Sequence, residues 1–198
     1  MSISKIKQTS FNIIKWVKEN KNIKEIEKEI NIKIQKDNVI KIAVSNILNT
    51  DVYNTNWLKP LLLMIEYNET DIIGFVELDR NLHTEHILPK KYQEHSEWIK
   101  LFTKELADKY LNSIGNLTLL SGTKNIKASN DIFENKIDIY LGNGREKNNN
   151  KISAFRITQK IWEDFETGKC KEWNEQAIIK RKNYLCKKIE KILDIEIL

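Results

Sequence analysis

The stretch His83–Lys136 reads HTEHILPKKYQEHSEWIKLFTKELADKYLNSIGNLTLLSGTKNIKASNDIFENK, and the rest of the chain is interpreted around it. It contains three motifs: Glu85-His86-Ile87-Leu88-Pro89, Gly115-Asn116-Leu117-Thr118-Leu119-Leu120, and a polar run around Asn125. The first two motifs predict short strands, and the third is predicted to open a helix. Residues 91–112 carry apolar side chains at helical spacing, so we expect a helical insertion between the two strands.

The composition is that of a water-soluble globular protein. The chain has 198 residues, of which 40% are hydrophobic and 31% charged. A net charge of +5 and a pI near 9 are compatible with a nucleic-acid partner, although many proteins of this charge bind no anion. Cys170 and Cys186 do not form a CxxC pair, so neither a disulfide framework nor a structural zinc site is expected.

The sequence predicts a cytoplasmic protein without a membrane partner. The N-terminal residues lack the apolar core of a secretion signal. The longest apolar run, Leu61–Ile65, is far too short to span a bilayer.

The segments outside the central stretch predict mainly helices. Residues 1–50 show apolar positions at steps of three and four, with breaks expected near Asn20 and Asn31. Trp57–Tyr67 is predicted to be a buried helix, with Pro60 in its first turn. Ile72–Leu78 is apolar and could be helix or strand.

After the central motifs the pattern returns to helices and loops. Asp131-Ile132-Phe133-Glu134 predicts a capping box for a helix that ends near Tyr140. Gly142–Asn150 predicts a loop, followed by two amphipathic helices. We therefore expect an α+β, predominantly helical fold in a single domain, residues 1–198: N-terminal helices (1–75), a core with two strands (76–142), and a loop with C-terminal helices (143–198).

Three side chains in the central stretch suit phosphodiester hydrolysis. Neutral histidine can take a proton from an attacking water, which indicates a role for His86. Hard divalent cations prefer oxygen ligands, which Glu85 and Asn125 would provide. A bound cation would stabilise charge on the phosphate and the leaving oxygen.

These motifs, together with Asn130–Lys136, resemble the HNH-type nuclease domain at the C-terminal end of GmrSD-like modification-dependent restriction proteins. That domain is a His-Me finger nuclease with a small ββα-metal core. The similarity covers roughly Trp57–Ile192, and the step of nine from Asn116 to Asn125 matches the separation seen in many HNH sites.

The resemblance implies a role for each motif residue. His86 would be the general base, and Glu85 and Asn125 would hold a divalent metal ion, Mg²⁺ or Mn²⁺. Asn116 would brace the loop and help to orient His86. Further candidates are His83, Asn130 and Lys136 as supporting groups, and Lys124, Lys127, Lys180 and Arg181 as contacts to nucleic acid. For each of these further residues, a solvated or loop-bracing role is the alternative interpretation.

The function implied is a metal-dependent DNA endonuclease, the cleavage module of a restriction or anti-phage defence system. Its partners would be DNA and a nucleotide-dependent recognition domain or subunit, separate from this chain or missing from it. The alternative is a catalytically inactive module that binds nucleic acid or docks to a protein. A helical structural domain is a third interpretation.

Overall fold

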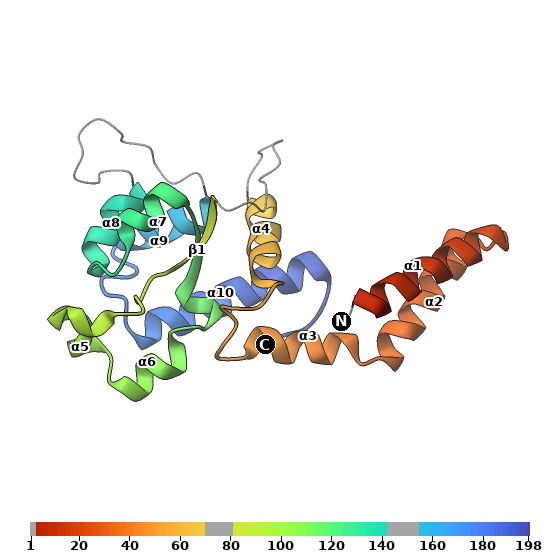
Figure 1. Cartoon of the computed structure of the whole chain (residues 1–198), viewed down its shortest axis with the longest axis horizontal. Coiled ribbons are helices and arrows are strands. Elements are labelled where there is room, and N and C mark those ends of the chain that lie inside the picture. The colour runs from red at the N-terminus through yellow and green to blue at the C-terminus, as the bar shows by residue number, and fades with distance from the viewer. Residues whose placement is uncertain (1–2, 70–80, 142–154) are drawn as a thin grey trace. The chain divides into compact units, whose positions relative to one another are not determined.

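The structure, a computed structural model, describes residues 3–69, 81–141 and 155–198 (Figure 1). The elements in these ranges are α1 (Ile3–Lys18), α2 (Ile23–Lys36), α3 (Val39–Leu48), α4 (Leu58–Glu69), β1 (Leu82–His86), η1 (Tyr92–Glu94), α5 (Ser96–Leu101), α6 (Lys104–Tyr110), η2 (Ile114–Asn116), β2 (Leu117–Ser121), α7 (Gly122–Ala128), α8 (Phe133–Leu141), α9 (Arg156–Glu166) and α10 (Glu175–Leu193). This inventory confirms the predicted α+β, predominantly helical class. The expectations for Ile72–Leu78 and Gly142–Asn150 fall outside the described residues.

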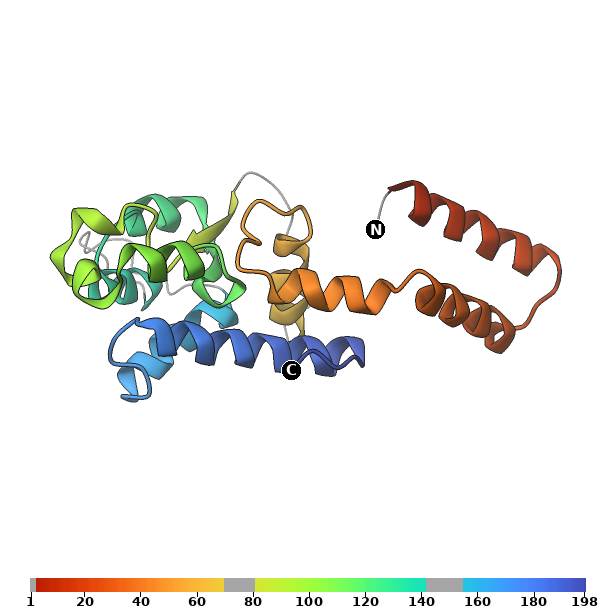
Figure 2. The ribbon, with the colours of Figure 1, turned by 90° about the horizontal axis from the view of Figure 1, so that it is seen from below.

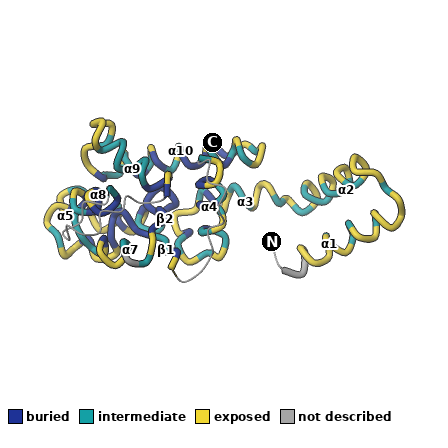
Figure 3. Tube along the Cα trace, turned by 90° about the horizontal axis from the view of Figure 1, so that it is seen from above, coloured by how far each residue is buried: buried dark blue, intermediate teal, exposed yellow. Residues whose placement is uncertain are grey.

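The chain divides into two compact units, Met1–Asn46 and Ile47–Leu198. In the first unit α1 contacts α2, and no residue of 6–46 is buried, as the teal and yellow tube of Figure 3 shows. The predicted break at Asn20 is confirmed, since this residue has a φ of 61°. The predicted break at Asn31 is wrong: α2 continues to Lys36, and the next break has Asn38 at a φ of 50°.

The second unit is built on an antiparallel pair of strands. Leu82 of β1 lies opposite Ser121 of β2, and His86 lies opposite Leu117. The predicted helical insertion between them is confirmed, because η1, α5, α6 and η2 fill this interval. Helix α7 follows β2 directly and contacts both strands, so the hairpin and helix follow one another in the order β-β-α (Figure 1).

Helix α10 supports the hairpin from the side of η2. The two elements are in direct contact, and Figure 2 shows α10 running along one side of the second unit. A Cβ atom on Gly115 would lie 2.3 Å from the carbonyl oxygen of Ile178. Glycine is therefore required for η2 to approach α10 this closely, and this approach positions Asn116.

Helices α4 and α9 both contact β2. The prediction of a buried helix around Pro60 is confirmed, since Leu58, Leu62, Leu63 and Ile65 are all buried. An aromatic cluster of Trp98, Phe133, Phe165 and Trp173 fills the core on the side of α5 and α8. No helix in the described part of the chain is both long and apolar enough to cross a membrane.

Candidate active site

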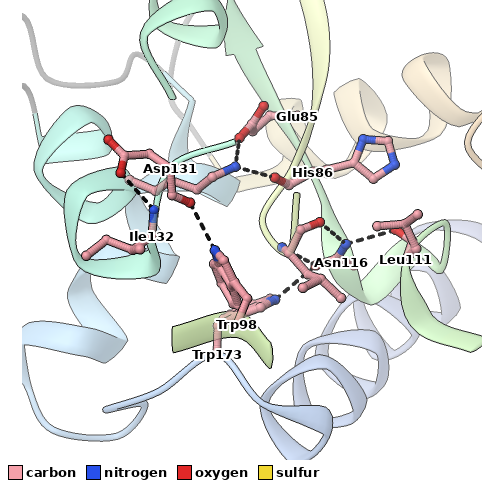
Figure 4. Close-up of polar contacts among 10 residues, drawn as sticks. Glu85, His86, Trp98, Leu111, Asn116, Asp131, Ile132 and Trp173 are labelled. Atoms are coloured by element: carbon pink, nitrogen blue, oxygen red, sulfur yellow. Dashed lines mark hydrogen bonds and ion pairs between the residues drawn. The ribbon is translucent and has the colours of Figure 1, made fainter. Parts of the chain in front are cut away.

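Glu85 lies near the end of β1 and is held by a lysine from α8. Lys136 is fully buried, and its Nζ donates to Glu85 Oε1 at 2.5 Å and to the His86 carbonyl oxygen at 2.6 Å (Figure 4). Burial raises the pKa of the Glu85 carboxyl, and the Lys136 ammonium opposes that rise. The structure therefore joins α8 to the last two residues of β1 through an ion pair.

The His86 ring is fixed on two sides. Its Nε2 lies 2.9 Å from Asn112 Oδ1, and its ring centroid lies 4.3 Å from that of Tyr53. Because an amide oxygen can only accept, Nε2 carries the hydrogen in this arrangement, and Nδ1 is left to accept a proton. Burial lowers the pKa of His86 to about 4, so the ring is neutral at neutral pH, the form that a general base requires.

The carboxamide of Asn116 fastens the segment that follows His86. Asn116 Oδ1 accepts from the Leu88 backbone N–H at 2.8 Å, and its Nδ2 donates to the Leu88 carbonyl at 3.0 Å. The same side chain also donates to the Leu111 carbonyl at 2.8 Å and accepts from Trp173 Nε1 at 2.9 Å (Figure 4). Asn116 is thus fully buried and ties β1, the insertion and the start of α10 together.

Glu85, His86 and Asn125 line one pocket of about 370 Å³. Glu85 and His86 are both paired in the β1–β2 ladder, and adjacent residues of a regular strand face opposite sides. Figure 4 shows the two side chains pointing in different directions, and both residues line the pocket. Asn125 comes from the middle of α7 rather than from the start of a helix. The other lining residues are Tyr53, Thr84, Pro89, Lys90, Ile126, Ser129 and Asn130.

The donor set of the pocket fits a hard divalent cation. A carboxylate from Glu85 and a carboxamide oxygen from Asn125 are oxygen ligands of the kind that Mg²⁺ and Mn²⁺ prefer. The Asn125 side chain makes no hydrogen bond to the described residues, so its oxygen is available. The described residues contain no group of three or more His, Cys, Asp or Glu that could hold a metal, so phosphate and water would have to complete the ligand set.

The further candidates fall into two groups. Asn130 lines the pocket, whereas His83 lies against Gly122 at the start of α7. Lys136 is buried in its ion pair, so in this structure it cannot reach a DNA phosphate. Lys124 Nζ donates to the Ile139 carbonyl at 2.8 Å, and burial lowers its pKa to about 8.

The remaining basic candidates differ in exposure. Lys127 and Lys180 are exposed. Arg181 is buried, and its guanidinium donates to the carbonyl oxygens of Ile157 and Leu117 at 3.1 and 3.3 Å. Burial lowers the pKa of Arg181 to about 10. The structure thus places Arg181 in the interior, where it connects α10 to β2 and α9.

The helix start at Asp131 differs from the predicted capping box. Helix α8 begins at Phe133, and the Asp131 carboxylate accepts from the Ile132 backbone N–H at 2.9 Å and from Asn135 Nδ2 at 2.7 Å. Trp98 Nε1 donates to the Asp131 carbonyl at 3.1 Å. This hydrogen bond therefore holds the turn between α7 and α8.

Three residues around His86 were not found from the sequence. Asn112 and Tyr53 contact the ring itself, and Lys90 Nζ lies 4.0 Å from the Tyr53 ring centroid. Asn112 and Tyr53 stand far from His86 in the chain, with no local pattern to mark them. Lys90 directly follows the first motif, and this position was its only signal.

Comparison with known proteins places the chain in one family. Residues 16–188 match the family described as "GmrSD restriction endonucleases, C-terminal domain". No curated protein sequence matches the chain. The match covers most of the chain, including every element of the pocket described above.

Proposed function

On the premise that the chain belongs to the GmrSD restriction endonuclease C-terminal domain family, we propose that it is a metal-dependent DNA endonuclease of the HNH type. As a member of this family it is a nuclease module of a restriction system, and DNA is the substrate that this implies. The proposal adds the reaction class, the metal and the residues.

One observation carries the proposal. Glu85, His86 and Asn125 come from β1 and α7, and they meet in a single pocket. The antiparallel register ends β2 opposite the start of β1, and α7 then contacts both strands, so that Asn125 lines the same pocket as Glu85 and His86. This combination provides a proton acceptor and oxygen ligands in one place, as phosphodiester hydrolysis requires.

Each residue has a distinct task in the proposed reaction. His86 Nδ1 takes a proton from the attacking water while Asn112 holds Nε2–H and the Tyr53 ring restrains the imidazole. Glu85 and Asn125 would hold Mg²⁺ or Mn²⁺, which when bound supplies charge stabilisation at the phosphate. Asn116 is a positioning residue, because its hydrogen bonds hold Leu88 just after the active histidine.

Cleavage of supercoiled plasmid tests the proposal. The protein should nick or cut the plasmid with Mg²⁺ or Mn²⁺, and a chelator or His86→Ala should abolish the activity. His95→Ala is the matched control, since His95 does not line the pocket. If purified protein with either metal cleaves no DNA but binds it, the chain is a nucleic-acid-binding module. If His86→Ala cleaves as well as the parent, the assignment of the base is wrong.

The recognition function is proposed to lie elsewhere. A nucleotide-dependent recognition domain or subunit would select the DNA and present it to this pocket. Exposed Lys127 and Lys180 are the basic candidates on the surface for contacts with phosphate. Charge reversal at each position should weaken DNA binding without changing the metal requirement.

A further inference from the structure

Lys136 already places a positive charge beside the candidate metal ligand. Its side chain is fully buried, and Nζ lies 2.5 Å from Glu85 Oε1 and 2.6 Å from the His86 carbonyl oxygen. Glu85 itself is 5% exposed and also lines the pocket. Glu85 is therefore both the ion-pair partner of an interior lysine and a lining residue of the pocket.

The one acidic residue that lines the pocket already has a cationic partner. Among its lining residues Glu85 is the one acidic side chain, and Lys90 is the one basic side chain. Lys136 adds a second positive charge directly behind Glu85. Asp131 offsets part of the charge on Lys136, but the Glu85 carboxylate is already paired with the Lys136 ammonium, and this pairing opposes a divalent cation at Glu85.

We propose that Lys136 is an internal counter-ion that competes with the divalent metal for Glu85, so that the pocket binds metal well only when a DNA phosphate is present. This inference rests on the proposed function. The physical basis is linkage. Lys136 stabilises the Glu85 carboxylate in the metal-free protein, so a divalent cation that binds Glu85 must displace the Lys136 ammonium or outweigh its repulsion. A phosphate in the pocket supplies the missing negative charge and becomes a ligand of the metal.

Binding of Mn²⁺ to the full chain, measured by electron paramagnetic resonance, tests this competition. The comparison uses the parent, Lys136→Met, Lys136→Gln, and Glu85→Gln as the variant without the carboxylate. The glutamine in Lys136→Gln keeps a hydrogen-bond donor but no charge, whereas the methionine in Lys136→Met matches the length of the aliphatic stem. All samples are compared at the same pH and ionic strength.

Both neutral variants should bind Mn²⁺ more than about tenfold more tightly than the parent, because like charges a few ångströms apart repel by several times the thermal energy. Glu85→Gln should lose Mn²⁺ binding both alone and in combination with either Lys136 variant. In a His86→Ala background a short duplex should raise the Mn²⁺ affinity of the Lys136-containing protein more than that of the neutral variants. Equal or weaker Mn²⁺ binding by a folded neutral variant would overturn the proposal.

Folding of the variants gives a second measurement. If Lys136→Met and Lys136→Gln unfold without metal, Mn²⁺ should restore their thermal transition, since the metal then takes the place of the ammonium. Failure of Mn²⁺ to restore folding at any concentration would reject the competition. Plasmid cleavage by the parent separates the proposed nuclease function from the proposed role of Lys136. If the parent cleaves DNA but the neutral variants gain no affinity for Mn²⁺, only the role of Lys136 is refuted.

Discussion

At the scale of single residues, the two asparagines of the central motifs have opposite surroundings. Asn116 is fully buried, and its Oδ1 and Nδ2 atoms both form hydrogen bonds, to Leu88, Leu111 and Trp173. Asn125 is half-buried, lines the pocket, and makes no side-chain hydrogen bond to the described residues. The same residue type therefore supports the fold in one position and is free for a ligand in the other.

Alanine substitution should separate these two roles. Asn116→Ala leaves buried backbone groups of Leu88 without partners and should lower the free energy of unfolding by about 3 kcal/mol. Asn125→Ala should change it by less than about 0.5 kcal/mol and abolish metal-dependent cleavage. Urea unfolding and plasmid cleavage measure the two effects. A stable Asn116→Ala or an active Asn125→Ala would contradict the assigned roles.

The hydrogen bond from His86 to Asn112 can be tested in the same assay. Asn112→Ala removes the acceptor that holds the Nε2–H of His86. Because His86 becomes charged in the proposed reaction, this hydrogen bond is worth about 1.5 kcal/mol. The cleavage rate should fall about tenfold. Asn112→Asp keeps an acceptor and should retain more activity than Asn112→Ala. Equal rates for Asn112→Ala and the parent would remove Asn112 from the site.

At the scale of elements, close contacts between helices position the two motifs. Gly115 lets η2 lie directly against α10, since a Cβ there would overlap the Ile178 carbonyl. Glu66 of α4 reaches α9 and accepts the backbone N–H groups of Arg156 and Ile157 at 2.8 and 3.0 Å. The first contact fixes η2, which leads directly into β2, and the second joins two helices that pack against β2.

Gly115→Ala should be the more damaging of two glycine substitutions. Its Cβ would meet backbone rather than a movable side chain, so we expect a loss of roughly 2–3 kcal/mol in the free energy of unfolding. Gly168 has a φ of 69°, and a Cβ there would meet only Lys171 Cε at 3.9 Å, an ordinary contact, so Gly168→Ala should cost only about 1 kcal/mol. Urea denaturation of both variants makes the comparison, and equal losses would show that η2 can move away from α10.

The carboxyl of Glu66 predicts a pH dependence of stability. Burial raises its pKa in the folded state, more than its hydrogen bonds to Ile157 and Arg156 lower it. Between the unfolded pKa near 4.5 and the raised folded pKa, the folded state binds more protons than the unfolded state. The contribution of Glu66 to stability therefore falls as pH rises through this window. The difference in unfolding free energy between the parent and Glu66→Gln should decrease with rising pH there, and a rising difference would contradict this assignment.

At the scale of the whole molecule, the two compact units differ in how they are stabilised. No residue of 6–46 is buried, whereas the second unit encloses the aromatic cluster, the hairpin and the pocket. The single domain expected over residues 1–198 stays a prediction. Burial of apolar side chains is the main source of folding free energy, so local opening should be easiest in the first unit.

Hydrogen exchange on the intact chain measures this difference. Amides of α1 and α2 should exchange at least about a hundredfold faster than those of β1, β2 and the middle of α10. Limited proteolysis should correspondingly cut first within residues 1–46. Equal protection in both units would show that the N-terminal helices bury surface in solution, for example against a partner.

Local patterns in the sequence determined much of this protein. The two strands, the buried helix at Pro60 and the helical insertion follow from apolar periodicity, proline and glycine, which act over a few neighbouring residues. The residue types of the candidate site, a carboxylate, an imidazole and a carboxamide, could also be identified from local sequence motifs. Their meeting in one pocket required only that β1 and β2 pair with α7 next to them.

Tertiary structure alone decided which side chains surround that site. Lys136 reaches Glu85 from α8, Asn112 reaches His86 from the insertion, and Arg181 turns inward to the carbonyl of Leu117. These partners come from elements far apart in the chain, and their choice depends on how helices pack around the hairpin. Periodicity marks which face of a helix is apolar, but it does not specify which buried charge will find which partner. Electrostatic pairing in the interior is decided by packing, because only the folded arrangement brings such groups within hydrogen-bond distance.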